Sequence, residues 1–290
     1  MGLRLKFNLV LLGTFLIGIA IAAGLLLPMI RDNARASVME SARIMMESAL
    51  AIRGYTASQI RPLLEPLMED RFLPHSVPSF AAQTNFQALR DRFPEYSYKE
   101  PALNPTNLAD RATDWEADII NAFRNDSTLD EISLVRDTPT GQSLVLARPI
   151  TASSQACLTC HSVPENAPPT MIDMYGSQNG FGWTLGDVIA AQVVSVPMTL
   201  PMSRAWTTFA SLMGALAAVF LMVGVGLNLL LNRVVIRPVV RIARMAEEVS
   251  LGRGDVPEYH HKARDEIGIL ATSFNRMRRS LESAMKLLND

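Results

Sequence analysis

The two cysteines of the chain are followed at once by a histidine, in the order Cys157-Leu158-Thr159-Cys160-His161. Two thiols at this spacing can each add across one vinyl group of a porphyrin to form a thioether. The adjacent histidine then lies under the ring and offers a nitrogen to the iron. The spacing is typical of c-type haem attachment. We therefore predict one covalent haem c held by Cys157 and Cys160, with His161 as the proximal axial ligand.

Other uses of two closely spaced cysteines fit less well. A redox dithiol usually lies at the start of a helix in a βαβ unit, whereas residues 151–155 before the motif have the composition of a polar loop. A zinc site needs four protein ligands, or three and a water, and only His161 and the two thiols are close in sequence. A disulfide across so short a loop would be strained.

Two apolar runs, residues 7–30 and 206–231, stand apart from the rest of this 290-residue chain. Each is long enough for a transmembrane helix, which needs about 20 apolar residues. The alternative for the first run is a cleavable signal peptide, with a cleavage site at Ala20-Ile21-Ala22. Because signal peptides have apolar regions of only about 7–15 residues, we predict that both runs are retained membrane spans.

Charges beside the two runs predict the topology. Arg4 and Lys6 precede the first run, and an excess of positive charge marks the cytoplasmic side. We therefore predict a two-pass protein of the bacterial inner membrane, with cytoplasmic residues 1–6 and 232–290 and a periplasmic domain over residues 31–205. Covalent haem attachment occurs on this outer side in bacteria, although Arg31 and Arg35 weaken the bias of the first span. The arginines that follow the second run are Arg233, Arg237, Arg241 and Arg244.

The outer domain reads as a mixture of helices and strands. We predict a long helix over residues 34–60, a second helix over 107–123, a hairpin of strands 131–136 and 142–150, and a strand over 188–198 that leads into the second span. The long helix has a narrow apolar seam, which fits packing on its own domain better than a dimer contact. The residues of this seam are Val38, Ala42, Met45, Ala49 and Ile52.

The sixth ligand of the iron has several candidates. His75, in a loop broken by prolines, is the other histidine of the outer domain and is our candidate distal ligand. A solvated His75, a methionine ligand or an open position remain alternatives, since methionines at helical spacing more often pack in a core. The methionines in question are Met45, Met46, Met68, Met171 and Met174.

Two arginines lie on apolar strand faces and need partners there. Arg136 shares a face with Ile132 and Leu134, and Arg148 shares one with Leu144 and Leu146. Haem propionates are suitable partners through bidentate pairing. The alternative is that each arginine ends its strand in solvent.

The outer domain resembles a family of PAS-like c-type haem domains found in bacterial membrane sensors. The resemblance implies an α+β PAS-like sheet with helices on one side, holding one haem. It adds Arg53 and Tyr55 to Arg136 and Arg148 as candidate propionate or pocket contacts. The distal ligand does not carry over, and it cannot be a thiolate because no cysteine is spare. The matching residues are Arg53-Gly54-Tyr55, Asn104-Pro105-Thr106-Asn107, Trp115-Glu116, Ala147-Arg148-Pro149, Cys157 to His161, Tyr175-Gly176 and Gly180 to Trp183.

The cytoplasmic end has two amphipathic helical stretches joined by a glycine-containing linker. Two such helices bury little surface alone, but two copies can form a four-helix bundle. The segment resembles a HAMP module in Pro238, Val256 and Asp265-Glu266-Ile267-Gly268. The resemblance implies an all-α parallel homodimer that relays motion from the membrane helix. The seams are Val235, Val239, Ile242, Ala246 and Val249 in the first stretch, and Ile267, Leu270, Phe274, Met277, Leu281, Ala284 and Leu288 in the second.

These features predict a membrane-bound haem sensor that relays redox state, or binding of NO, CO or O2, to a HAMP module. The expected partners are the lipid bilayer, a second copy of the chain and a separate cytoplasmic output protein. The alternatives are a membrane-anchored monohaem electron carrier and a domain whose haem is structural. The near-neutral net charge of -1 lacks the signature of nucleic-acid binding. No catalytic constellation points to an enzyme.

Overall fold

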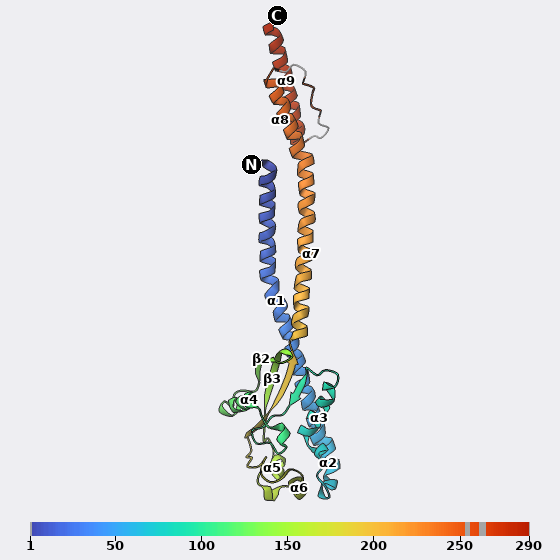
Figure 1. The fold of residues 1–290 in the computed structure, drawn as a ribbon, viewed down its shortest axis with the longest axis vertical. Coiled ribbons are helices and arrows are strands. Elements are labelled where there is room, and N and C mark those ends of the chain that lie inside the picture. The colour runs from blue at the N-terminus through green and yellow to red at the C-terminus, as the bar shows by residue number, and fades with distance from the viewer. Residues whose placement is uncertain (1, 253–255, 261–264, 290) are drawn as a thin grey trace. The chain divides into compact units, whose positions relative to one another are not determined.

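The chain divides into two compact units in the computed structural model, which describes residues 2–252, 256–260 and 265–289 (Figure 1). One unit is Pro28–Thr208, and the other combines Met1–Leu27 with Phe209–Asp290. Helices α1 (Leu3–Tyr55) and α7 (Thr199–Leu231) contribute residues to both units.

A four-stranded antiparallel sheet in the order β1-β4-β3-β2 forms the centre of the Pro28–Thr208 unit. The inner strands are β3 (Gly141–Thr151) and β4 (Val188–Pro197), and the edge strands are β1 (Ser97–Lys99) and β2 (Ile132–Thr138). Both inner strands have a run of five buried residues, 143–147 and 190–194, as expected for strands covered on both faces. The predicted hairpin and the predicted third strand are confirmed.

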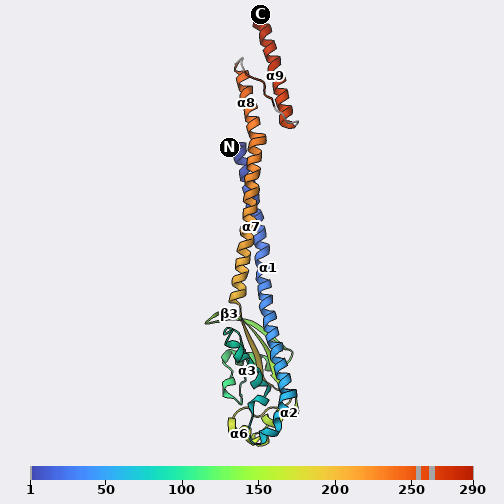
Figure 2. The same ribbon diagram turned by 90° about the vertical axis from the view of Figure 1, so that its right-hand side faces the viewer.

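Helices cover both faces of this sheet, whereas the resemblance implied helices on one side. One face, with Leu144 and Val194, packs against α1 and α3 (Pro78–Arg90). The other face, with Val145 and Val193, packs against α4 (Asp114–Asn125). Figure 2 shows α1 and α3, the two helices that pack against the first of these faces. The alternating strand pattern explains this arrangement, because successive side chains point to opposite faces.

The second predicted helix begins later than the sequence indicated. Asn107 caps a 3-10 turn, Leu108–Asp110, through its side chain. α4 starts at Asp114 with a capping box, in which Glu116 accepts a hydrogen bond of 2.8 Å from the Thr113 amide. Two competing caps lie six residues apart in the sequence, and only the later one opens a full helix.

The long helix of the outer domain is continuous with the first apolar run in α1, which ends at Tyr55 and is followed by a π-helical turn, Thr56–Ile60. The seam of α1 packs on its own domain, as predicted, because Val38, Ala42 and Ala49 are buried against the sheet. Pro28 is accommodated inside the helix.

Short elements complete the Pro28–Thr208 unit. They are α2 (Arg61–Leu64), a 3-10 helix Glu65–Glu69, a 3-10 turn Pro74–Ser76, α5 (Gln155–His161), a 3-10 turn Pro164–Asn166 and α6 (Pro169–Tyr175). In Figure 1, α5 and α6 lie at the end of this unit opposite the β2–β3 turn. The helix α3, the strand β1 and the helix α6 were not predicted, because prolines and short lengths obscure their periodicity.

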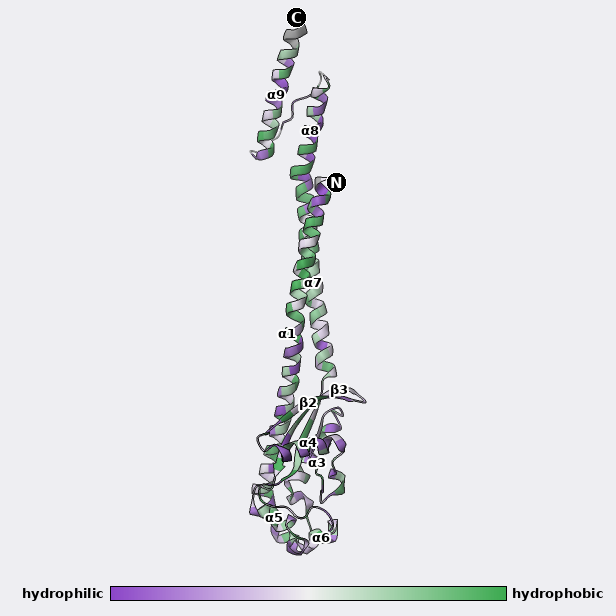
Figure 3. Ribbon diagram, turned by 90° about the vertical axis from the view of Figure 1, so that its left-hand side faces the viewer, coloured by the Kyte–Doolittle hydropathy of each residue, from purple (hydrophilic) through white to green (hydrophobic). Residues whose placement is uncertain are grey.

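Two helices, over Arg4–Glu69 and Thr199–Ser250, contain stretches long and apolar enough to cross a membrane. Figure 3 shows the hydrophobic colouring along the N-terminal part of α1 and along α7. Phe15 stacks on Phe220 with ring centroids 4.8 Å apart, and Asn228 donates a hydrogen bond of 3.0 Å to Asn8. Polar contacts of this kind hold helices together in lipid.

After α7 come a π-helical turn (Asn232–Ile236), α8 (Arg237–Ser250) and α9 (Glu266–Asn289). Ile242, Val256 and Phe274 form the buried centre between α8 and α9, so the connector residue Val256 packs into the helix pair. Asp265 accepts a hydrogen bond from the Gly268 amide at 2.9 Å and caps α9. The predicted break in the linker includes residues 253–255, which lie outside the described residues.

Candidate functional site

The short helix α5 carries Cys157, Cys160 and His161 together. Its first turn begins at Ser154, whose carbonyl accepts a hydrogen bond of 3.1 Å from the Cys157 amide. Both cysteines are free thiols and half-buried. The motif is therefore helical. Of the lead-in that was predicted to be a polar loop, Thr151 ends β3 and Gln155 begins α5, which leaves residues 152–154 outside these elements. The redox-dithiol interpretation still lacks its usual setting, because β3 before the helix and β4 after it are antiparallel.

The ring of His161 is held in a defined orientation. Its Nδ1 lies 2.7 Å from the Gly180 carbonyl oxygen and 3.5 Å from the Thr106 hydroxyl. The Trp183 ring stacks on the imidazole at 3.9 Å between centroids, with 15° between the planes. Because a carbonyl oxygen only accepts hydrogen bonds, Nδ1 carries the proton and Nε2 carries the lone pair. This is the tautomer of a metal-ligating histidine that is oriented by a backbone carbonyl.

Backbone bonds tie the Gly180–Trp183 loop to the end of α5. The Gly182 amide donates to the Ser162 carbonyl at 2.8 Å, and the Trp183 amide donates to the His161 carbonyl at 3.2 Å. The loop and the helix therefore hold the imidazole from two sides, and Nε2 is the nitrogen left for a ligand or a metal.

Burial and charge set the protonation of the motif. Burial lowers the pKa of His161 below its ordinary value, the bond to Gly180 opposes this, and the positive charge of Arg61 adds to the lowering. Burial raises the pKa of the Cys160 thiol, and Arg61 opposes this shift. The histidine is thus held in its neutral form, which is the form that binds metals.

An apolar cluster surrounds Cys160. Phe72 and Met171 are buried in it, and Phe72 meets Tyr175 edge to face at 5.8 Å. These side chains come from α6 and from the segment after α2. The cluster offers a flat hydrophobic ring system an apolar wall next to the thiol. Its other members are Met68, Val77, Ala167, Ile172 and Phe181.

The segment that carries the motif leaves the sheet and returns through one narrow point. The Ala152 amide donates to the Asp187 carbonyl at 2.9 Å, and the Gly186 amide donates to the Ala152 carbonyl at 3.0 Å. We call this pair of hydrogen bonds the neck. Everything between residues 152 and 187 is thereby connected to the ends of the paired strands β3 and β4.

Tyr55, a predicted pocket contact, and His75, the predicted distal ligand, share a separate cleft of about 450 Å³. His75 is exposed there and meets Phe80 edge to face at 5.3 Å. None of the three motif residues lines this cleft. The neighbouring Ser76 contacts Met68 of the Cys160 cluster, with its hydroxyl 3.1 Å from the sulfur. The assignment of His75 as the distal ligand stays a prediction.

The predicted arginines have partners within the protein. Arg53 forms an ion pair with the buried Glu100. Arg148 pairs with Glu47 of α1 at 2.7 Å and with Glu131 at 3.0 Å.

Arg136 lies over the ring of Trp115, with 3.9 Å from the guanidinium carbon to the ring centroid. The structure therefore brings neither Arg136 nor Arg148 into contact with the motif helix, and their assignment to haem contacts stays a prediction. Among the methionines, Met45 and Met46 belong to the α1 core, whereas Met68 and Met171 lie in the Cys160 cluster.

Sequence reasoning did not assign roles to Thr106, Arg61 or the Gly180 carbonyl. Thr106 and Gly180 lie within the stretches that carry the resemblance. The sequence therefore singled out these residues but did not show that they contact His161. No sequence pattern pointed to Arg61 as a neighbour of the motif. Its charge lies near Cys160 and His161 only because the segment after α1 folds back towards them.

Comparison with known protein families gives a match for each of two parts of the chain. Residues 31–197 match the Tll0287-like family, described as Tll0287. The chain belongs to the Tll0287-like family. Residues 230–283 match the HAMP domain. Neither match points to a family of enzymes.

A solved structure is similar to this Tll0287-like chain. It is described as the crystal structure of the cyanobacterial heme-protein Tll0287, with a TM-score of 0.43 and 16% sequence identity, over 55% of this chain and 94% of that chain. The search of curated proteins gave no match. The predicted combination of a domain of this family followed by a HAMP module is thus confirmed.

Proposed function

We propose that this chain is a membrane-bound sensor with one haem c, attached through thioethers to Cys157 and Cys160 and ligated by His161. The observation that carries the proposal is the fixed tautomer of His161, whose Nδ1 is 2.7 Å from the Gly180 carbonyl while two free thiols share its helix. Similarity to a heme-protein supports the same cofactor.

The residues present fit such a group. His161 offers Nε2, Trp183 keeps its ring from turning, and the Cys160 cluster supplies an apolar wall. Arg61 is the cation whose field reaches both Cys160 and His161, so it is suited to pair with a propionate. When bound, haem would supply an iron that can change its oxidation state or its sixth ligand. His75, Met68 and Met171 are the distal candidates.

A route from the motif to the membrane helix runs through the neck. A displacement of His161 would move the Gly180–Trp183 loop, and the neck joins that loop to β4. β4 ends at Pro197 and α7 starts at Thr199, so no flexible linker absorbs the movement. We infer that α7 carries it to the HAMP module, whose alternative packings would then change in population.

The proposed setting is the bacterial inner membrane. The haem domain, with a PAS-like fold, would be periplasmic between spans 7–30 and 206–231, and residues 232–290 would form a cytoplasmic homodimeric module. A separate output protein would receive the signal. The arginines at the start of this module are exposed, which suits contact with lipid phosphate.

A membrane-anchored electron carrier is the second candidate. One covalent haem suffices for electron transfer, but the HAMP match over residues 230–283 favours signalling.

An absorption spectrum of the full-length protein tests the proposal, in the oxidised state, the reduced state, and the reduced state with CO or NO. Haem staining after denaturing electrophoresis reports covalent attachment. We expect staining of the wild type and its loss in Cys157→Ala/Cys160→Ala. Thr159→Ala, which changes a spacer residue between the two cysteines, is the matched control and should stain normally.

The spectra also separate the candidates. A six-coordinate reduced spectrum indifferent to CO would favour redox sensing or electron transfer, and His75→Ala and Met68→Ala would then identify the sixth ligand. Ready CO binding would favour a gas sensor. An unstained wild-type band from cells that attach haem would overturn the proposal.

A further inference from the structure

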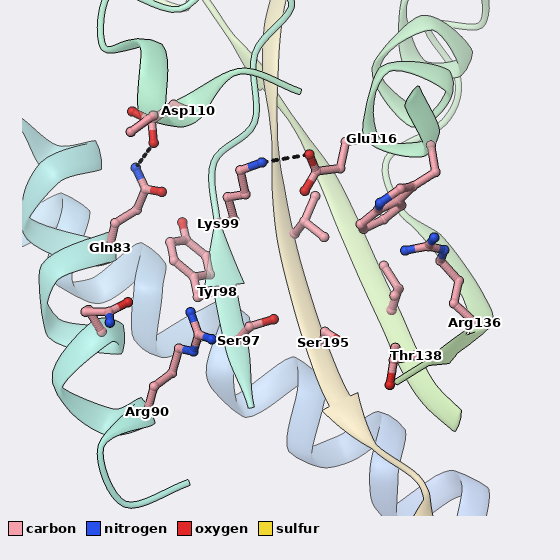
Figure 4. Close-up of a pocket in the computed structure, with 15 residues that line it drawn as sticks. Gln83, Arg90, Ser97, Tyr98, Lys99, Asp110, Glu116, Arg136, Thr138 and Ser195 are labelled. Atoms are coloured by element: carbon pink, nitrogen blue, oxygen red, sulfur yellow. Dashed lines mark hydrogen bonds and ion pairs between the residues drawn. The ribbon is translucent and has the colours of Figure 1, made fainter. Parts of the chain in front are cut away.

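A second cleft, of about 490 Å³, opens on the α4 side of the sheet (Figure 4). Its floor contains Ser97, Val145, Val193 and Ser195, from three neighbouring strands, and α3 and α4 form its walls. None of the lining residues belongs to the Cys-Cys-His motif or to the Cys160 cluster.

Arg136 is a cation in this cleft whose charge has no acidic partner among the described residues. It is half-buried, and within the described residues it forms no ion pair. Its guanidinium face is engaged by the Trp115 ring at 3.9 Å. Stacking uses only the face of the group, so the N–H donors at its edge remain available in the plane. Figure 4 shows Arg136 at the side of the cleft.

The acidic residues of the cleft are already committed to other partners. Glu116 accepts a hydrogen bond of 2.8 Å from the Lys99 ammonium and another from the Thr113 amide. Asp110 accepts a hydrogen bond of 3.0 Å from Gln83. Neither carboxylate therefore neutralises Arg136 across the cleft.

The charge balance of the lining also favours an anion. Three cations, Arg90, Lys99 and Arg136, face two acids, Asp110 and Glu116. Hydroxyls of Ser97 and Ser195 add neutral donors on the floor, whereas the Thr138 hydroxyl donates to the Gly141 carbonyl at 2.6 Å. Burying an unpaired cation is costly, so a bound carboxylate would relieve a cost that the protein carries without it.

We infer that this cleft binds a small organic carboxylate. The carboxylate pairs with the edge of the Arg136 guanidinium, and the carbon skeleton lies against Trp115, Val145 and Val193. The inference goes beyond the proposed haem function and stands without it, because no residue of the cleft belongs to the Cys-Cys-His motif or to the Cys160 cluster. It gives Arg136 a carboxylate partner other than a haem propionate. Ser195 lies two residues before the end of β4, so an occupant would touch the strand that leads into α7.

Isothermal titration calorimetry of the full-length protein with three probes tests the inference. The probes share a four-carbon skeleton and differ in charge: succinate, 1,4-butanediol and putrescine. We expect saturable binding of succinate alone. Arg136→Gln should weaken it by about 10- to 100-fold, the effect of losing a hydrogen-bonded charge pair. Arg136→Lys, which keeps the charge and loses the fork, should lie between.

Arg92→Gln is the matched control, an exposed arginine of the same unit that does not line the cleft. It should bind succinate like the wild type. Thermal unfolding of every variant shows that it is folded. Equal binding by Arg136→Gln and the wild type would overturn the inference. So would the failure of succinate to bind the wild type, or equal binding of the diol. A haem-free but folded wild type should still bind succinate, which separates this test from that of the haem site.

Discussion

Gly180 has two roles at the residue scale. Its carbonyl fixes the proton of His161, and its own backbone has φ +82°, in the left-handed region that favours glycine. A Cβ at this position would lie 2.0 Å from the Thr106 hydroxyl. The orientation of His161 therefore depends on a residue that has no side chain.

Gly180→Ala should destabilise the domain more than Gly182→Ala does. Both glycines have φ +82°, but a Cβ at Gly182 meets nothing within 4 Å. The left-handed alanine alone costs about 1–2 kcal/mol, and Gly180→Ala adds the clash with Thr106. Thermal unfolding of the two variants measures the difference in Tm. Equal losses would show that Thr106 does not confine this loop.

At the scale of elements, a buried polar network joins α1, β1 and β4. Arg53 of α1 pairs with Glu100, and the Tyr98 hydroxyl of β1 donates to Glu100 at 2.6 Å. Gln192 of β4 donates to the Tyr98 oxygen at 2.8 Å. Glu100 and Gln192 are almost fully buried, so the network has little solvent to replace a lost partner. It holds the long helix in register with the sheet.

This network predicts a loss of stability at alkaline pH. Burial, and then the negative charge of Glu100, raise the pKa of Tyr98 far above its ordinary value. Above about pH 10 the unfolded state loses the tyrosine proton while the folded state keeps it, so the folded state binds more protons. The free energy of unfolding therefore falls as the pH rises above that value. The contribution of Tyr98 is fully present below it.

The measurement is the change in Tm of the full-length protein between about pH 8 and about pH 11. The Tm of the wild type should fall more over this range than the Tm of Tyr98→Phe, because the variant has no phenol to ionise. Phe86→Leu is the control for destabilisation itself, because Phe86 packs against the Tyr98 ring at 4.9 Å without a titrating group. This variant should have a lower Tm at both pH values, but its decrease in Tm between the two pH values should equal that of the wild type. An unchanged loss in Tyr98→Phe would refute the assignment.

At the scale of the whole molecule, the helix pair α8–α9 leaves part of its apolar seam uncovered. Phe274 packs inside the pair, whereas Leu270, Met277 and Leu281 are exposed in the single chain. An exposed apolar stripe of this kind is expected to be covered by another helix, and the HAMP match makes a second copy the natural partner.

The proposed homodimer predicts that Leu281→Asp shifts the full-length protein from dimer to monomer, because an acid in the seam would be buried without a partner. Ile269→Asp is the matched control, since Ile269 lies on α9 off the seam and is 68% exposed. Light scattering after size-exclusion chromatography measures the mass. A dimer that survives Leu281→Asp would place the contact between copies elsewhere.

The motif, the apolar runs and several of the helices and strands can be predicted from the sequence, because they depend on local spacing. Two thiols and a histidine define the motif wherever the chain folds, and apolar runs of membrane length need no tertiary information. The β2–β3 hairpin, the strand β4 and the start of α9 follow from alternation, turn residues and a capping aspartate. The seam of α1 also follows, since its spacing permits only one buried face.

Other features required the folded chain, because they join residues distant in sequence. Nothing local shows that Gly180 meets His161, that Glu100 pairs with Arg53, or that Arg136 stacks on Trp115. The helix start at Asp114 was decided by competition between two caps, and the helices on both sheet faces by where α1 and α4 find apolar area to cover. Local spacing thus determines which chemistry the motif can perform. Long-range packing decides which nitrogen of His161 is free and which cations are left for a ligand.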